Sequence, residues 1–477
     1  MNRRTSKLDQ TPRAGRSITL GRAVVPPETA ATSPEPTRGI NTVSRRGVRK
    51  AGFIIEESKP RRSWRPGRLL RNAVALMISS VGTAVLGVVF WGVATRLVAP
   101  SNIGRASAEI AAMSLLANVA QLGLASTYKR FMPIAGRRSR TFVVRGYEMC
   151  VAATLVLSII YVACGFARRF IPSTLPDHIL FVIAVALWAI FLMQDDVLIS
   201  LRAARWVPVE NVVFSLAKLA LLPMLVAVNA TRGVYLSWMS PVVVAVFIVN
   251  WYLFRRLIPE HSMKPVSSEV LPSLREIALL GVGQYATSLL SILSTSLITL
   301  IVIAKLGASA SAYYYLPAVI TAGIGQLLWN VVTSFLVEAS TEPEALRHHV
   351  RVTVRAMAVV LIPGLVLGEI LAPEILRVFG PAYASHGTTL LRLLLLALLG
   401  TAVTDFYSSL AWIDKRVWWM AAREFVSFVI LIGVLLACIG HFGIIAAGIA
   451  ALVSSGTQAL FFLPITIRRY RAIVRGP

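Results

Sequence analysis

Charged residues are scarce in this chain, and acidic residues are the scarcest of them. Asp and Glu together number 22 among 477 residues, and all charged residues make up 15%. Hydrophobic residues make up 56%, and the mean hydropathy is +0.70. A water-soluble domain of this length could not bury so much apolar surface. The composition therefore predicts a protein that crosses a membrane many times.

Cysteine and histidine are also rare, with three and six copies. The cysteines all lie inside apolar runs and show neither a disulfide framework nor metal-ligand spacing, and the histidines are scattered. The sequence lacks a Walker motif, a nucleophile elbow and a zinc-binding pattern, and its Gly281-x-Gly283 follows no predicted strand. We therefore expect no cofactor, no metal, no ATP coupling within this chain and no enzymatic activity.

The first long apolar runs predict a helical hairpin across the membrane. Between Arg71 and Arg96 lie 24 residues without a charge, enough to cross a hydrocarbon core of about 30 Å at about 1.5 Å per helical residue. A turn follows at Pro100–Gly104, and a second apolar run returns to Lys129. The runs are continuous rather than alternating, which favours helices over a β-barrel.

The same pattern continues along the chain and predicts an all-α membrane protein. Ten further spans are expected at 148–167, 179–203, 207–229, 233–254, 277–304, 309–336, 350–371, 388–411, 417–438 and 442–466. The twelve spans form two six-helix lobes, 71–257 and 277–467, joined by a linker at 258–276 and followed by a short basic tail at 468–477.

The distribution of basic residues predicts the orientation in the membrane. Residues 1–71 hold 17 Lys and Arg against 5 Asp and Glu, so we expect residues 1–70 to be a disordered cytoplasmic tail. This tail lacks the apolar core of a signal peptide, and anionic lipid headgroups are a better match for it than nucleic acid. Alternate loops after the tail hold 20 and 7 Lys and Arg, which places both termini in the cytoplasm.

The two halves match each other at an offset of 209 residues. The matched positions are Arg96-Leu97 with Lys305-Leu306, Arg168-x-Phe170-x-Pro172 with Arg377-x-Phe379-x-Pro381, and Asp196-x-x-x-Ser200-Leu201 with Asp405-x-x-x-Ser409-Leu410. Six spans separate the matched segments, so both repeats have the same orientation. We expect a pseudo-twofold axis along the membrane normal, with a cavity between the lobes.

Five short stretches of this sequence resemble a known family. The resemblance rests on Arg96-Leu97…Pro100…Gly104, Gln121-Leu-Gly-Leu before Lys129-Arg130-Phe131, Lys305-Leu-Gly307…Tyr314-Tyr315, Asn330…Phe335-Leu…Glu338 and Phe379-Gly-Pro-Ala-Tyr383. These patterns cover about 71–467 and are similar to the polysaccharide flippases of the multidrug/oligosaccharidyl-lipid/polysaccharide exporter superfamily. The tail is longer than this family usually carries, and lipid II flippases of the same superfamily have fourteen spans.

The resemblance implies a flippase in the inner membrane of a bacterium. Its substrate would be a polyprenyl-pyrophosphate-linked oligosaccharide for cell-surface polysaccharide biosynthesis, moved by alternating access with a proton or sodium gradient as the energy source. A drug/cation antiporter of the same superfamily stays open as the alternative. A membrane-bound glycosyltransferase or ligase ranks third, because the longest loop on the outer side offers only Glu374 and His386.

Four charged residues inside predicted spans are candidates for ion coupling, because a charge in mid-membrane costs about 2.5–3.5 kcal/mol on insertion scales. Asp195 and Asp196 lie in the fourth span and Lys218 in the fifth, at similar depth, so Lys218 and an aspartate could form a buried ion pair. That pair could simply tie the two spans together. The functional alternative makes Asp196 and its repeat-mate Asp405 proton- or cation-responsive carboxylates that face the cavity.

Basic and polar residues supply candidates for substrate contacts. A pyrophosphate needs cations, and the candidates are Lys129 and Arg130 at the cytoplasmic mouth and Arg96, Arg105 and Lys305 towards the outer mouth. Each could instead set topology or contact headgroups. Gln284 and Asn330 could bind sugar hydroxyls, although such groups often bond to neighbouring helices. We expect the aromatic residues Tyr313–Tyr315, Trp238, Trp251, Trp418 and Trp419 to lie at the membrane interfaces.

Overall fold

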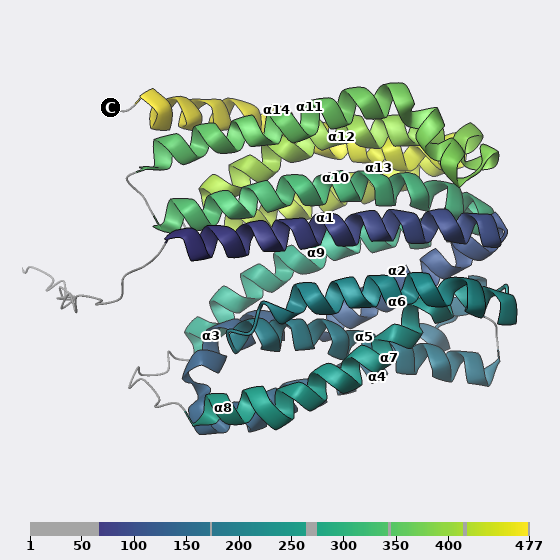
Figure 1. Ribbon diagram of the computed structural model, residues 1–477. Helices are drawn as coiled ribbons and strands as arrows, with labels where there is room; N and C mark the ends of the chain where they lie inside the picture. Colours follow the sequence, from purple (N-terminus) through teal and green to yellow (C-terminus); the bar gives the residue numbers. More distant parts are fainter. Residues whose placement is uncertain (1–65, 172–173, 264–273, 342–344, 414–416, 476–477) are drawn as a thin grey trace, which may run out of the picture. The chain divides into compact units, whose positions relative to one another are not determined.

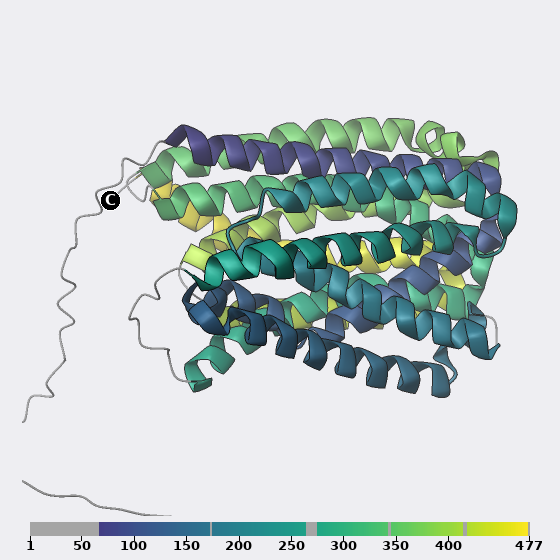
Figure 2. The same cartoon turned by 60° about the horizontal axis from the view of Figure 1, so that its bottom comes forward.

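The chain folds into long helices that run lengthwise between two ends of one unit, Trp64–Pro477 (Figures 1 and 2). The computed structural model describes residues 66–171, 174–263, 274–341, 345–413 and 417–475. These ranges contain helices and turns but no strand, so the all-α prediction is confirmed for them. Residues 1–65, which make up most of the predicted basic tail, lie outside the described residues.

The first half of the chain contains seven long helices and one short one. They are α1 (Pro66–Leu97), α2 (Pro100–Ala120), α3 (Leu124–Ala135), α4 (Ser139–Ala163), α5 (Leu175–Ser200), α6 (Trp206–Val228), α7 (Gly233–Tyr252) and the short α8 (Ile258–Ser262). The second half contains α9 (Leu274–Leu306), α10 (Ala308–Thr341), α11 (Leu346–Phe379), α12 (Pro381–Ile413), α13 (Val417–Phe442) and α14 (Ile445–Arg475). Each predicted span falls on one of these helices except the second, which is divided between α2 and α3, and α14 extends into the predicted C-terminal tail as far as Arg475.

Ten described helices are long and apolar enough to cross a membrane, or eleven when the bent pair α2 and α3 counts as one span. In α1 the side chains are described only from Val81, and this apolar part alone is shorter than a span. The backbone of α1 is nevertheless helical over 32 residues. The number of twelve spans therefore stays a prediction.

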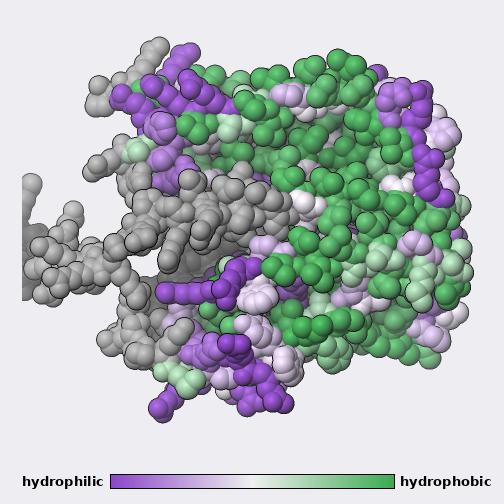
Figure 3. Space-filling model, in the orientation of Figure 1, coloured by the Kyte–Doolittle hydropathy of each residue, from purple (hydrophilic) through white to green (hydrophobic). Residues whose placement is uncertain are grey.

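We name the two ends of the helices by their turns. The Gly307 end holds the turns after α1, α9 and α11, and the C-terminal end holds the end of α14 and the connection between α5 and α6 (Figure 1). On the face seen in Figure 3, hydrophobic residues form a broad band and hydrophilic residues gather mostly towards the two ends. This distribution suits a hydrocarbon layer between two polar surfaces.

The second predicted span is broken, which the apolar pattern did not predict. Leu122 and Gly123 have φ angles of 49° and 75° between α2 and α3, and the two helices meet at a bend of 52°. Glycine accepts this left-handed conformation without the cost that a side chain imposes. The Tyr285 hydroxyl of α9 donates to the Val119 carbonyl at 2.7 Å, so a carbonyl at the end of α2 gains a partner from the second half of the chain.

The helices of each half pack mainly against one another. In the first half, α6 packs on α1 and α7, and α5 packs on α2, α3 and α4. In the second half, α12 packs on α10, α11 and α14, and α13 packs on α9 and α14. Contacts between the halves come mainly from α1 against α10 and α11 and from α2 against α9 and α10, so α1 and α2 are the helices that join them (Figure 1).

The two halves touch most closely at the Gly307 end. A Cβ atom placed on Gly104 of α2 would lie 1.7 Å from the Ala308 carbonyl oxygen of α10, so the two backbones are in direct contact there. Nearby, the Arg96 guanidinium of α1 donates from Nε to the Val378 carbonyl of α11 at 3.1 Å. These two contacts join the halves at this end.

A buried ion cluster holds three helices of the first half together at the same end. Arg232, at the start of α7, lies 2.9 Å from Glu109 of α2 through Nη2 and binds Asp177 of α5 through Nη1. The Glu109 side chain is 4% exposed and the Arg232 side chain 11%. Removing one partner from such a cluster leaves a buried charge uncompensated, so this cluster is a structural tie.

We expect Gly104→Ala to lower the melting temperature of the detergent-purified protein. The new methyl group must push α2 away from the backbone of α10, and overpacking of this kind costs about 1–3 kcal/mol. Gly440→Ala in α13 is the matched control, because a Cβ there meets nothing within 4 Å and alanine favours helix. Equal melting temperatures for the two variants would contradict the close contact.

We expect Arg232→Met to destabilise the protein by about 3–5 kcal/mol, since it strands the Glu109 carboxylate in the protein interior. Arg377→Met is the control: Arg377 is paired with Glu374 at the same end, but both side chains are more than half exposed, and such pairs contribute about 1 kcal/mol or less. Denaturation in detergent measures both variants. The double change Arg232→Met with Glu109→Gln should recover part of the loss, and a loss no larger than that of the control argues against the tie.

Candidate functional site

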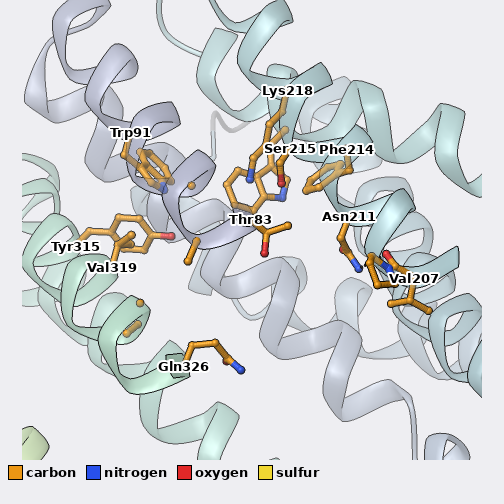
Figure 4. A pocket seen from close by; sticks show the side chains of 16 residues that line it. Thr83, Trp91, Val207, Asn211, Phe214, Ser215, Lys218, Tyr315, Val319 and Gln326 are labelled. Atoms are coloured by element: carbon orange, nitrogen blue, oxygen red, sulfur yellow. Dashed lines mark hydrogen bonds between the residues drawn. The ribbon is translucent and has the colours of Figure 1, made fainter. Parts of the chain in front are cut away.

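A central cavity of about 470 Å³ lies between the two halves. Its lining residues come from α1, α6 and α7 of the first half and from α10 of the second. Figure 4 shows Tyr315, Val319 and Gln326 of α10 on one side and Lys218, Phe214 and Asn211 of α6 on the other. The cavity extends from Trp91 and Tyr315, whose ring centroids are 4.8 Å apart, towards the start of α6 near the C-terminal end.

Lys218 is the one charged residue among the described residues that line this cavity. It is 5% exposed, and its ammonium lies 3.7 Å from the ring centroid of Trp238, 4.9 Å from that of Phe214 and 5.2 Å from that of Phe90. A cation over the face of an aromatic ring is attracted by the ring quadrupole. The three rings therefore compensate part of the cost of burying the charge.

Among the described residues, no carboxylate compensates the remaining cost of burying the Lys218 charge. Within the described part of the chain, Lys218 Nζ has no carboxylate oxygen within 4.0 Å and makes no hydrogen bond. The neighbouring Trp238 Nε1–H is buried and lacks an acceptor as well. The wall formed by α6 and α7 thus presents hydrogen-bond donors that have no protein acceptor, which suits a ligand rich in acceptor oxygens.

The aromatic residues differ from the sequence prediction. We expected Trp238 and Tyr315 at the membrane interfaces, but both line the central cavity, where Trp238 also packs on Trp91 with ring centroids 6.2 Å apart. Trp251 and Trp419, in contrast, are 64% and 61% exposed. Trp238 is held inside by ring contacts with Phe90 and Trp91 of α1, and such tertiary contacts cannot be read from an apolar sequence.

The expected pairing of Lys218 with an aspartate is replaced by a different ion pair. Asp196 Oδ1 lies 2.8 Å from Nζ of Lys129 on α3, a side chain that is 49% exposed. The bend between α2 and α3 lets α3 pack on α5, and this brings Lys129 to Asp196 instead. Asp405 makes no ion pair with the described residues; its charge interacts with Arg423 and Glu424 of α13, which form a pair with each other at 2.8 Å.

None of the predicted basic residues is among the described residues that line the central cavity. Arg96, Arg105 and Lys305 lie at the Gly307 end with exposed side chains, and Arg96 is engaged by the Val378 carbonyl. Lys129 lies towards the C-terminal end, and the side chain of Arg130 is outside the described residues. Their roles at the two mouths remain predictions.

The predicted sugar contacts have different outcomes. The side chain of Gln284 lies outside the described residues. Asn330 lies one helical turn from Gln326 on α10 and accepts a hydrogen bond from its amide at 3.2 Å. Gln326 lines the cavity, whereas the Asn330 amide nitrogen is buried without a partner. The residue in position to contact a ligand is therefore Gln326.

A buried polar cluster in the first half was missed by the sequence analysis. Gln194 of α5 donates to Glu210 of α6, and Asn250 of α7 donates to Gln194 at 2.8 Å. Asn211, next to Glu210, lies 3.5 Å from Asp195 Oδ2 and also lines the cavity. Glu210 stands only four residues into α6, near the end of a predicted span, and yet it is only 8% exposed. Among the described residues, no group of three or more His, Cys, Asp or Glu could hold a metal ion.

No protein-family model and no curated protein matches this chain by sequence, so the comparison is one of folds.

Solved structures with a similar fold are transporters. The inward-facing structure of a multidrug resistance MATE family transporter of the MOP superfamily is similar with a TM-score of 0.59 and 14% identity, over 85% of this chain and 99% of that one. The MATE multidrug transporter DinF-BH, solved in complex with a ligand, gives 0.59 and 15%, over 86% and 97%. A MOP superfamily transporter from Pyrococcus furiosus, described as having a binding pocket of reverse polarity that suggests a different function, gives 0.55 and 12%, over 84% and 96%. This chain has the fold of MATE transporters of the MOP superfamily.

Proposed function

We propose that this protein is a multi-pass membrane transporter that carries an amphiphile with an anionic headgroup, by alternating access of the central cavity. The substrate class that fits best is a polyprenyl-pyrophosphate-linked oligosaccharide, moved across the inner membrane of a bacterium for cell-surface polysaccharide biosynthesis. One observation supports this choice above others: the only charge among the described residues lining the cavity is the ammonium of Lys218, and no carboxylate pairs with it.

The cavity chemistry matches the parts of such a substrate. A pyrophosphate offers negatively charged acceptor oxygens, and charge-assisted hydrogen bonds to them are about twice as strong as neutral ones. Gln326 and Asn211 offer amides for sugar hydroxyls, and the aromatic faces offer apolar contact to sugar rings. The volume of about 470 Å³ is in the range of ligand sites. The long prenyl tail would stay in the lipid.

The proposed transport cycle uses the contacts between the halves. The predicted orientation puts the C-terminal end in the cytoplasm, so the cavity would load from that side while the Gly104–Ala308 contact closes the Gly307 end. Opening of the Gly307 end requires α1 and α2 to separate from α10 and α11. Lys129 would attract the headgroup at loading, and Arg96, Arg105 and Lys305 would receive it on release.

A drug/cation antiporter is the second candidate, and the structural neighbours fit it at least as well. They include MATE multidrug transporters, one of them solved with a ligand, and the cavity here is rich in aromatic residues, which also suit flat organic cations. A cationic drug, however, gains from an acidic cavity, and no carboxylate lies among the described lining residues. The charge at position 218 therefore discriminates between the two candidates.

We expect Lys218→Met to lower transport of the lipid-linked oligosaccharide by about tenfold to a hundredfold, because hydrogen bonds to a charged group contribute about 1.5–3 kcal/mol. Lys218→Arg should keep much of the activity, since it keeps the charge. The measurement uses cells in which this gene is deleted and each variant is restored. Mass spectrometry identifies the lipid-linked sugar that accumulates, and its accessibility from outside reports flipping.

The control is Arg377→Met, which also removes one positive charge but lies at an exposed pair outside the cavity. It should restore transport fully. If deletion changes no lipid-linked sugar but raises sensitivity to cationic drugs, and Lys218→Met protects cells better than the wild type, the antiporter is the correct function and the flippase proposal is wrong.

A further inference from the structure

Arg392 of α12 and Glu369 of α11 form an ion pair on the outer surface of the second half. Arg392 Nε lies 3.8 Å from Glu369 Oε2, and the two side chains are 47% and 28% exposed. Neither residue is among the described residues that line the central cavity, which come from α1, α6, α7 and α10. In Figure 1, α11 lies at the outer edge of the second half. The pair is therefore separate from the candidate transport site.

The pair lies inside the membrane rather than at its surface. Glu369 is ten residues before the end of α11 at Phe379, and Arg392 is eleven residues after the start of α12 at Pro381. At about 1.5 Å per residue, both lie about 15–17 Å from the Gly307 end of their helices, which is deeper than a headgroup layer of about 5–7 Å. Charges exposed to hydrocarbon at that depth are costly, so this pair needs a cover.

One hydrogen bond of the pair has a local structural explanation. Pro373 has no N–H, so the Glu369 carbonyl four residues earlier loses its helical donor, and Arg392 Nε donates to it at 3.1 Å. This bond holds the guanidinium at the depth of Glu369, away from the headgroups. The two terminal nitrogens of Arg392 make no hydrogen bond to the described residues, and Glu369 Oε1 is buried without a partner. Donors and an acceptor are therefore left over.

The surface around the pair is apolar. Ile362 and Val366 lie seven and three residues before Glu369, on the same side of α11, and Leu399 lies seven residues after Arg392, on the same side of α12. All three apolar side chains are exposed. In lipid, apolar contact between helices has no hydrophobic driving force, and polar side chains strengthen their association. An apolar face with charges at its centre therefore suits a contact between membrane helices.

This face is complementary to itself. The predicted topology inserts every copy of the protein in the same direction, so a twofold axis between two copies runs along the membrane normal and keeps each residue at its depth. Because Glu369 and Arg392 lie side by side at one depth, such an axis brings the glutamate of each copy opposite the arginine of the other. The terminal nitrogens of each arginine then meet a carboxylate, the acceptor that arginine binds most strongly.

We propose that this face is the contact between two copies of the protein in the membrane, with two reciprocal ion pairs between Arg392 of one subunit and Glu369 of the partner subunit. Ile362, Val366 and Leu399 pack around the two pairs. The contact uses none of the described residues that line the central cavity, and it does not rest on the proposed function. A single helix of another protein is the alternative occupant, but one acidic and one basic residue at the same depth match a second copy.

The test uses the full-length protein in liposomes at decreasing ratios of protein to lipid, with subunits counted by single-molecule photobleaching. Glu369→Gln and Arg392→Met each remove one charge and carry different fluorophores. Each variant alone should associate about tenfold to a hundredfold more weakly than the wild type, because both reciprocal pairs are lost. Mixed with each other, the two variants should associate more strongly than either does alone, because Arg392 of the first then meets Glu369 of the second.

Two further variants serve as controls, and melting temperatures check that every variant is folded. The double variant Glu369→Gln with Arg392→Met leaves no unpaired charge in the lipid, so it tests the contact even where a single variant fails to fold, and it should be monomeric. Glu374→Gln removes an equal charge from the exposed pair with Arg377 and should dimerise like the wild type.

Cysteine cross-linking tests the location of the contact. Cys150, Cys164 and Cys438 are first replaced by alanine. Ile362→Cys should then cross-link two copies, and Val156→Cys, at an exposed position of α4, should not. A wild type that is monomeric at every density, a dimer that persists in the double variant, or a cross-link at position 156 and not at 362 overturns the proposal. A monomer that retains another membrane protein through these two charges overturns the choice of a second copy.

Discussion

The buried ammonium of Lys218 sets the character of the central cavity. Among the described residues, aromatic rings and not carboxylates compensate its charge. Attraction to a ring face contributes about 2 kcal/mol when the pair is desolvated, which is less than the several kcal/mol that burial of an ion costs. Three rings from α1, α6 and α7 surround Lys218, and this arrangement explains why those helices pack closely around it. An anion in the cavity would offset the remaining cost, and this is why an anionic headgroup is the proposed ligand.

The helices could be predicted from the sequence because each is a long apolar run, and in lipid such a run has no alternative to internal backbone hydrogen bonds. The bend at Gly123 could not be predicted, since a single glycine with a positive φ leaves the apolar pattern unbroken. This bend in turn decides that Lys129 meets Asp196. The position of each residue along its helix predicted which charged residues lie at the same depth in the membrane. Which of them form an ion pair depends on how the helices are placed around the cavity. Trp238 shows the same limit, because periodicity in a wholly apolar helix does not tell its inward face from its lipid face.

The comparisons explain why the substrate has to be argued from the cavity. At 12–15% identity this chain keeps the fold of these transporters over more than four-fifths of its length, and a likeness of this kind does not identify the substrate. For one of these neighbours, a reverse polarity of the binding pocket is described as suggesting a different function. Apolar contacts between helices do not depend on the sign of the cavity charge, whereas binding of a charged headgroup does. The residue at position 218 is therefore more informative about the substrate than the fold around it.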